Sequence, residues 1–205
     1  MFVNKLEVGN LATNCYAIGD VDNKKAVVID PGGDADKILD VIKKHGFHVE
    51  FIILTHGHGD HIGGLEKVRE ATGAKVAVHK KDAHMLHSAT ANLSKFIGSG
   101  VELTTADIYL NGGESFTVGG LKLQIIHTPG HTPGGISIKI DNVIFTGDTL
   151  FAGSIGRTDF PGGSYKQLLD SIKKKLLNEP DDTKIFPGHG PESTIGEEKR
   201  FNPFL

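Results

Sequence analysis

Apolar residues recur along the chain in two spacings, one typical of strands and one typical of helices. Short runs rich in Val, Ile, Leu and Phe favour extended structure, and they cover 25–30, 49–54, 75–79, 121–127, 136–140, 142–148 and 183–189. Other stretches repeat apolar residues at helical spacing, which predicts helices over Asp34–Lys44, His61–Ala71 and Tyr165–Leu177. Thr194 followed by Glu197 is a capping signal and predicts a short last helix.

Strands that alternate with helices predict sheets with helices packed outside them, which is an α/β arrangement. The chain has 205 residues, enough for one large domain with a substantial core. No Ser- or Pro-rich linker divides it, so we expect a single domain over residues 1–205. The small and polar residues of Ser88–Gly100 predict a loop. Loops of this length often have a function of their own, so we expect it to border the substrate.

Composition and charge exclude several classes of function. With 38% hydrophobic and 23% charged residues, the chain is typical of soluble globular proteins. A net charge of -3 gives no general attraction to nucleic acid or to anionic membranes. The N-terminus lacks the pattern of a signal peptide, and no apolar run approaches the ~20 residues of a membrane span. We therefore expect a cytoplasmic protein that binds neither nucleic acid nor a membrane; the sequence indicates no oligomeric state.

Any metal chemistry must use histidine and carboxylate ligands. The single cysteine, Cys15, excludes an intrachain disulfide and lies in the strand-like LATNCYAI, where a small packed side chain is expected.

Several predicted strands end in a glycine-rich, polar sequence that carries a residue able to bind a metal. Asp30 closes VVID, the cluster HGHGDH follows FIILT, and His131 lies in HTPGHTPGG after LQIIH. Asp148 closes VIFTGD, and His189 closes IFPGH. Because strand ends at the same edge of a sheet converge in space, we expect these residues to meet in one cleft.

The cluster HGHGDH has the spacing of metal ligands. His56 and His58 are separated only by a glycine, so both imidazoles can approach one ion. Asp60 and His61 follow directly, close enough to serve a second ion. The set is completed at other strand ends by His131, Asp148 and His189. These nitrogen and oxygen donors predict two divalent ions per chain, zinc first with iron or manganese as alternatives, and paired catalytic metals lie ~3.5–4 Å apart.

At these residues the sequence resembles the metallo-β-lactamase superfamily. The matching motifs are THGHGDH at 55–61, PGH at 129–131, TGD at 146–148 and PGH at 187–189, in the family's order. The resemblance implies a four-layer αββα sandwich with the metals at the sheet edge. It also implies a ligand set: a first metal on His56, His58 and His131, a second on Asp60, His61 and His189, and Asp148 bridging both.

Residues 147–172 and the ending PGHGPESTIGEEKRFNPFL resemble the glyoxalase II (hydroxyacylglutathione hydrolase)-like group, short bacterial type. An antibiotic-hydrolysing member would usually carry cysteine in place of Asp148, and a flavodiiron protein an acidic residue at the His58 position, so neither is expected. Full-length glyoxalase II has a helical extension that supplies basic residues to glutathione, and this chain stops at Leu205 without one. Arg157 falls where that enzyme has a glutathione-binding lysine; its guanidinium can bind a substrate carboxylate or pair locally with Asp159.

The implied activity is that of a dinuclear hydrolase of thioesters, with S-lactoylglutathione-like substrates first. In the expected mechanism a metal-bridging hydroxide, oriented by Asp60 as the catalytic residue, attacks the carbonyl carbon. Because a thiol has a pKa of ~8.5, the thiolate leaves without a general acid. The expected partner is therefore a small-molecule thioester such as a glutathione conjugate.

Two other interpretations remain. Persulfide dioxygenases keep the GRTDF run but bind one non-haem iron through residues matching His56, His131 and Asp148. A non-catalytic metal-binding protein is the other, and the presence of all seven ligand types argues against it.

Two further polar residues lie near the predicted cleft. Asp30 matches no ligand position of the family, and we expect it to form a hydrogen bond with the histidine cluster. His127 ends a strand four residues before His131. For His127, a hydrogen bond to a ligand and simple burial stay equally open.

Overall fold

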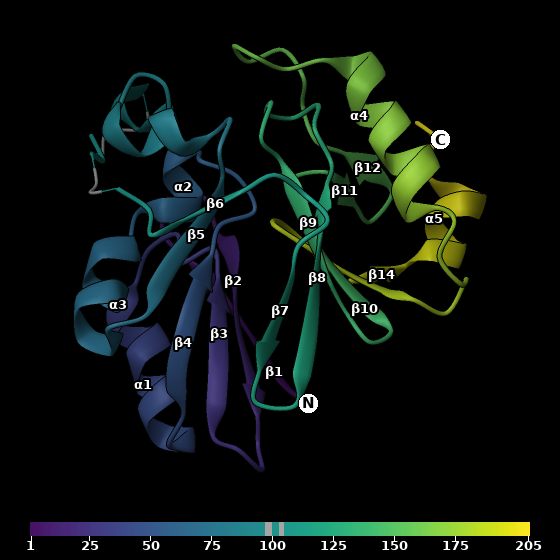
Figure 1. Ribbon diagram of the computed structural model, residues 1–205. Coiled ribbons are helices and arrows are strands. Elements are labelled where there is room, and N and C mark those ends of the chain that lie inside the picture. The colour runs from purple at the N-terminus through teal and green to yellow at the C-terminus, as the bar shows by residue number, and fades with distance from the viewer. Residues whose placement is uncertain (97–99, 103–104) are drawn as a thin grey trace.

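The computed structural model describes residues 1–96, 100–102 and 105–205. Two six-stranded sheets pack face to face, and helices cover the outer face of each (Figure 1). The first sheet has the strand order β1 (Phe2–Val8), β2 (Thr13–Asp20), β3 (Lys25–Ile29), β4 (His48–Ile53), β5 (Lys75–His79), β6 (Ile108–Leu110). The second has the order β14 (Ser193–Thr194), β13 (Lys184–Pro187), β10 (Val143–Gly147), β9 (Ile136–Ile140), β8 (Leu121–His127), β7 (Ser115–Val118). A separate pair consists of β11 (Leu150–Phe151) and β12 (Ser154–Ile155).

The helices form the two outer layers. On the first sheet lie α1 (Ala35–His45) and α3 (Leu65–Thr72), and on the second lie α4 (Tyr165–Ser171) and α5 (Ile195–Phe201) (Figure 1). The short α2 (Gly59–Ile62) and the 3-10 helices Ala83–His87 and Ser94–Phe96 lie in the connections, and the π-helical turn Ile172–Leu176 continues α4. The predicted four-layer αββα sandwich is thus confirmed. Within the described residues, no helix combines the length and the apolar character that crossing a membrane requires.

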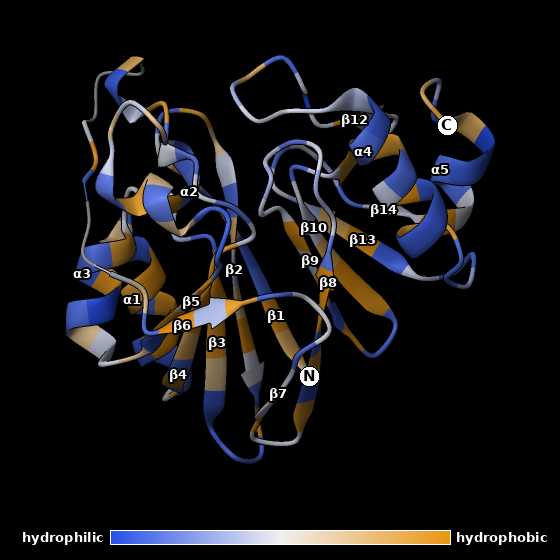
Figure 2. Cartoon of the chain, turned by 45° about the horizontal axis from the view of Figure 1, so that its top comes forward, coloured by the Kyte–Doolittle hydropathy of each residue, from blue (hydrophilic) through white to orange (hydrophobic). Residues whose placement is uncertain are grey.

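Three apolar layers hold the four structural layers together. Ile38 and Val68 pack between the first helical layer and its sheet, and Ile144 and Leu168 pack between the second sheet and its helices. Phe145 points to the opposite side of β10 from Ile144 and lies in the layer between the two sheets. Figure 2 shows this pattern as orange strands between helices that carry hydrophilic residues on their outer sides.

The strand directions place the polar residues that follow the strands at one edge of the two sheets. β3, β4, β5 and β6 run parallel, and in the second sheet β10 and β13 run parallel while β8 is related to β10 through two antiparallel pairings. The carboxyl ends of β3, β4 and β5 therefore share an edge, as do those of β8, β10 and β13. Polar residues that follow these strands meet where the two sheets adjoin.

Hydrogen bonds between the sheets fix this junction. The hydroxyl of Tyr16, on β2, donates to the carbonyl of Pro187 at 2.6 Å. The Asn14 side-chain amide donates to the carbonyls of Pro187 and Gly190, each at 2.9 Å, and the Asn14 backbone N–H donates to Gly188 at 2.7 Å. The first sheet thereby holds the loop of the second sheet that carries His189.

Each predicted strand is present; three have the predicted bounds and the others differ by one or two residues at an end. The strand β1 was not predicted, because it lies at the edge of its sheet and most of its side chains are only partly buried. Its neighbour β2 contains the strand-like LATNCYAI stretch, and Cys15 is fully buried there. Thr194 caps the last helix as predicted, since its hydroxyl accepts from the Glu197 N–H at 3.2 Å.

The predicted continuous helix over His61–Ala71 is wrong, because the structure divides it into α2 and α3 at Gly63 and Gly64. A Cβ atom at Gly63 would lie 2.6 Å from the Gly32 carbonyl oxygen, so the chain approaches the loop after β3 too closely for any side chain. The expected loop at Ser88–Gly100 contains the 3-10 turn Ser94–Phe96, and residues 97–99 lie outside the described residues.

Replacing Phe145 by Ala tests the layer between the sheets. The Phe145 ring is 0% exposed and lies 4.9 Å from the ring of Tyr16 and 5.3 Å from that of Phe186, between centroids. We expect the free energy of unfolding of the metal-free protein to fall by about 3–5 kcal/mol in denaturant titrations. The control Phe201→Ala, at a side chain 76% exposed, is expected to change it by less than about 0.5 kcal/mol. Equal losses in both variants would contradict this assignment of the core.

Candidate metal centre

Seven titratable side chains converge where the two sheets adjoin. The first sheet supplies four of them: His56 and His58 from the loop after β4, and Asp60 and His61 from α2. The second sheet supplies His131 between β8 and β9, Asp148 directly after β10, and His189 after β13. These are the seven residues that the sequence predicts to meet, and they form three overlapping groups of potential ligands.

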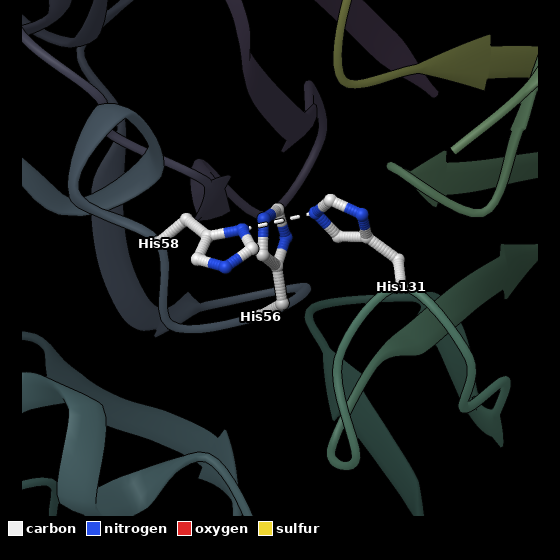
Figure 3. Close-up of side chains that lie close together, drawn as sticks. All are labelled: His56, His58 and His131. Atoms are coloured by element: carbon white, nitrogen blue, oxygen red, sulfur yellow. Dashed lines mark hydrogen bonds between the residues drawn. The ribbon is translucent and has the colours of Figure 1, made fainter. Parts of the chain in front are cut away.

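The first group consists of His56, His58 and His131, whose ligand atoms lie within 4.8 Å of one another. Figure 3 shows the three rings turned toward a common point, with His58 and His131 on opposite sides and the His56 ring between them. His58 Nδ1 and His131 Nε2 are 2.9 Å apart, joined by the dashed line of Figure 3. Two ring nitrogens this close can share a proton, or both can direct lone pairs at one cation.

The other two groups extend the centre from His56 toward His61 and His189. One consists of His56, His61 and Asp148, and the other of Asp60, His61 and His189. His189 Nε2 lies 3.1 Å from Asp60 Oδ2. His61 Nε2 lies 3.4 Å from Asp148 Oδ1 and 3.6 Å from Asp60 Oδ2, near or beyond the limit of a hydrogen bond.

Several buried atoms at this point have no hydrogen-bond partner. They are His56 Nε2, His61 Nε2 and Asp148 Oδ1. Unpartnered buried polar atoms are rare and unfavourable, and those of native proteins usually have a reason. A divalent cation among these nitrogen and oxygen donors would satisfy all three, so the residues present fit metal ions.

Histidine pKa values are shifted in opposite directions at the two ends of the centre. Burial, followed by the neighbouring His131, lowers the pKa of His58 to about 3. Burial, followed by the neighbouring His61, also lowers the pKa of His56 well below its ordinary value. Both imidazoles therefore stay neutral with lone pairs available. Burial also opposes the charged form of His61, but the carboxylates around it, Asp60 foremost, outweigh burial and raise its pKa. The surroundings of His61 thus favour a positive charge.

A set of outer hydrogen bonds orients the rings. Asp30 Oδ2 lies 2.9 Å from His61 Nδ1, which confirms the predicted hydrogen bond between Asp30 and the histidine cluster. The same carboxylate accepts from the Thr55 N–H at 2.7 Å and from its hydroxyl at 2.6 Å. His131 Nδ1 lies 2.7 Å from the carbonyl oxygen of Arg157. In His61 and His131 alike, these contacts leave Nε2 directed at the centre.

Asp82 is a buried residue of the site that the sequence analysis missed. Its carboxylate accepts from the Thr132 hydroxyl and from the Gly134 N–H, each at 2.6 Å, and it also accepts from the Gly57 N–H. It therefore joins the HGHGDH loop of the first sheet to the His131 loop of the second. The signal that could have found it is its place just after the predicted strand 75–79, by the same strand-end rule.

His127 lies apart from the centre. Its ring stacks on His79 with centroids 4.1 Å apart, and its Nε2 lies 3.0 Å from the Pro133 carbonyl oxygen. No hydrogen bond, ion pair or ring contact joins it to the seven converging side chains. Of the two alternatives for His127, partial burial is therefore the one found.

Of the two partners predicted for Arg157, a substrate carboxylate and Asp159, the structure shows the local pair with Asp159. Its Nε and one terminal nitrogen donate to the two carboxylate oxygens of Asp159, at 2.8 and 2.7 Å. The guanidinium also lies 3.8 Å from the ring centroid of Phe160. Arg157 lines a cavity of about 550 Å³ that opens over the centre and is bordered by His58, Asp60, His131, Asp148 and His189.

Several known proteins are similar to this one over the whole chain. Hydroxyacylglutathione hydrolase GloC of Haemophilus influenzae is 39% identical over 209 residues, which cover 100% of this chain and 98% of the relative. Among solved structures, that of BLEG-1 B3 metallo-beta-lactamase has a TM-score of 0.95 and 39% identity, covering 100% of this chain and 99% of the other.

Two further structures are similar. TTHA1623, in a di-iron-bound form, has a TM-score of 0.87 and 35% identity, with 100% of both chains covered. ETHE1 from Myxococcus xanthus has a TM-score of 0.84 and 33% identity, covering 99% of this chain and 84% of the other. The family model of the metallo-beta-lactamase superfamily matches residues 8–189, which contain the whole centre. The chain therefore belongs to the metallo-beta-lactamase superfamily.

Proposed function

We propose that this protein is a dinuclear metal-dependent hydrolase of thioesters, with hydroxyacylglutathione-type substrates such as S-lactoylglutathione as the first class to test. The observation that carries the proposal is the position of Asp148. Its Oδ1 lies 3.4 Å from His61 Nε2, and its Oδ2 lies 3.6 Å from His131 Nε2. One carboxylate thus faces both ends of the cluster, as a ligand shared by two ions would.

The ligand sets follow from this division. His56, His58 and His131 would hold one ion; Asp60, His61 and His189 would hold the other; and Asp148 would contribute to both. Nitrogen and oxygen donors of this kind suit zinc first, with iron or manganese as alternatives. The similarity to GloC, described as a hydroxyacylglutathione hydrolase, supports the thioester, and the di-iron-bound form of TTHA1623 supports two ions.

Bound divalent ions would supply water activation, by lowering its pKa toward neutrality, and stabilisation of negative charge on the substrate carbonyl oxygen. Asp60 is the proposed catalytic residue. Burial opposes its ionisation, but His61 and the hydrogen bond from His189 outweigh burial and lower its pKa, so it stays a carboxylate. The Thr13 hydroxyl donates to Asp60 Oδ2 at 3.2 Å and helps to fix it. Asp60 can then orient the attacking water by accepting its hydrogen bond.

The leaving group explains why a thioester is preferred to an amide. A thiol has a pKa of ~8.5, so the thiolate departs at neutral pH without a proton donor. An amine must be protonated to leave, and the titratable side chains at the centre are all assigned as ligands or their hydrogen-bond partners. Because the chain is similar to a protein described as a B3 metallo-beta-lactamase, a β-lactam is included in the assay as a comparison substrate.

The second candidate function is that of a mononuclear non-haem iron persulfide dioxygenase. The similarity to the ETHE1 structure supports this candidate. Its iron would use His56, His131 and Asp148. In that case the donors of Asp60, His61 and His189, which lie within 4.8 Å of one another, would hold no ion.

Metal stoichiometry separates the two candidates. We expect about two ions per chain, zinc or zinc with iron, by elemental mass spectrometry of protein purified without added metal. His189→Ala removes a ligand of one ion only and is expected to lower the content to about one, while His84→Ala, at an exposed histidine outside the cluster, keeps the wild-type value. About one iron per chain in the wild type, unchanged in His189→Ala, would favour the dioxygenase.

Asp60→Asn tests the proposed catalytic residue. The amide keeps the shape of the carboxylate but loses its charge, so kcat for S-lactoylglutathione should fall by about 10²–10⁴-fold in an assay of thiol release. The control is Asp22→Asn, an exposed aspartate remote in sequence from the seven residues, for which kcat stays at the wild-type value. A metal-loaded Asp60→Asn protein with wild-type kcat would remove Asp60 from the mechanism.

Asp30→Ala tests the outer hydrogen bond to His61. Without its acceptor the ring is free to turn, and we expect metal affinity and turnover to fall by about 10–100-fold. Competition with a chelating dye measures the affinity, and thiol release measures the turnover. If neither changes, Asp30 has no part in the function of the centre.

A further inference from the structure

The cavity over the centre has two chemically different parts. Its floor consists of the proposed ligands, whereas its sides carry apolar side chains: Leu11, Leu93, Phe151, Ile155 and Phe160. These come from the β1–β2 loop, the Ser88–Gly100 segment, the β11–β12 pair and the loop before α4. Four separate parts of the chain thus place apolar surface beside the same centre.

Leu93 is held there in an unfavourable backbone conformation. Its φ is 64°, a left-handed value that a bulky side chain rarely adopts. Strain of this kind persists only where the surrounding contacts impose it, and it is concentrated at functional sites.

The contacts that impose it come from the preceding residue, Asn92, which is fully buried. Its side-chain amide donates to the carbonyls of Met85 and Val101, at 2.9 and 2.8 Å, and its Oδ1 accepts from the Ser94 N–H at 2.9 Å. Its backbone carbonyl accepts from the N–H of Gly59, the residue before Asp60, at 2.7 Å. The leucine is therefore fixed in position relative to the proposed catalytic residue.

Above the proposed metal ions, the described side chains of the cavity wall offer an anionic group no unpaired positive charge. Among the described residues that line it, Arg157 is the one side chain with a permanent positive charge, and both oxygens of Asp159 already neutralise it. A substrate carboxylate at Arg157 would have to share the guanidinium with Asp159. An uncharged apolar group would instead fit against Leu93 and Phe160 and displace only water.

We propose that this cavity binds the acyl half of the substrate, and that, among the thioesters of the proposed function, those of medium-length aliphatic or aromatic acids are hydrolysed faster than the lactoyl thioester. The inference rests on the proposed thioester hydrolysis and changes only the acyl group. In the reaction, the oxygen of water bonds to the carbonyl carbon and the carbon–sulfur bond breaks. The products are the carboxylate, the thiol and one proton.

The experiment compares acyl groups on a constant thiol, with the zinc-loaded protein. The S-lactoyl, S-butanoyl and S-hexanoyl thioesters of glutathione are assayed beside the same three thioesters of N-acetylcysteamine, which carries no charge. We expect kcat/KM to rise with chain length on both thiols, by up to about fourfold for each methylene that becomes buried.

The outcomes separate the inference from the proposed function. S-lactoylglutathione as the fastest substrate, with falling kcat/KM along the series, would overturn the inference and leave thioester hydrolysis standing. Hydrolysis of none of the six thioesters by protein with its full metal content would overturn both.

The variant Leu93→Asn links the preference to this side chain. Asparagine tolerates the left-handed conformation better than leucine, so the loop is expected to keep its shape while the apolar surface becomes polar. We expect the ratio of kcat/KM for hexanoyl over lactoyl to fall about tenfold, with an unchanged melting temperature as the check on folding. Leu93→Gly, which also accepts this φ, should lower the same ratio, while the control Phe201→Ala keeps it. A wild-type ratio in both Leu93 variants would overturn the role of Leu93.

Discussion

The burial of unpartnered ligand atoms at the junction of two sheets is the constraint on which the rest of this structure depends. His56 Nε2, His61 Nε2 and Asp148 Oδ1 lie out of water without a hydrogen bond, a situation that native proteins rarely tolerate. The side chains behind them are placed to keep these atoms where they are. Asp30 fixes the His61 ring, the Arg157 carbonyl fixes the His131 ring, and Asp82 joins the loops that carry them.

The same constraint explains why the junction between the sheets contains polar as well as apolar contacts. Ile and Phe side chains of the central layer bring the sheets together but do not determine their relative position to the accuracy that a metal site needs. The hydrogen bonds of Tyr16 and Asn14 to the loop before His189 supply that accuracy. In the connection after β5, Asn92 has a similar role and holds Leu93 beside the cavity.

Much of the fold and the composition of the site could be predicted from the sequence, for physical reasons that also explain the failures. The central strands are continuous apolar runs, and HGHGDH places four titratable groups so close together that few alternatives to a metal site exist. Three features depend instead on contacts between remote segments. The break between α2 and α3 arises from the loop at Gly32, and the role of Asp82 arises from Thr132 and Gly134. The left-handed conformation of Leu93 arises from the hydrogen bonds that join Asn92 to Met85, Val101 and Gly59. The strand-end position of Asp82 is a local signal for that residue, but no local spacing indicates its partners or the other two contacts.

Each sheet is built from one continuous part of the chain, residues 2–110 for the first and 115–194 for the second. Contacts between residues near in sequence form faster than contacts between remote ones. During folding, each half is therefore expected to assemble its own sheet before the two halves dock. Each proposed ligand set takes residues from both halves, so a partly folded chain would carry the histidines without a centre. The complete ligand sets would then arise only in the last step, which keeps an incompletely folded chain from acquiring the reactive site.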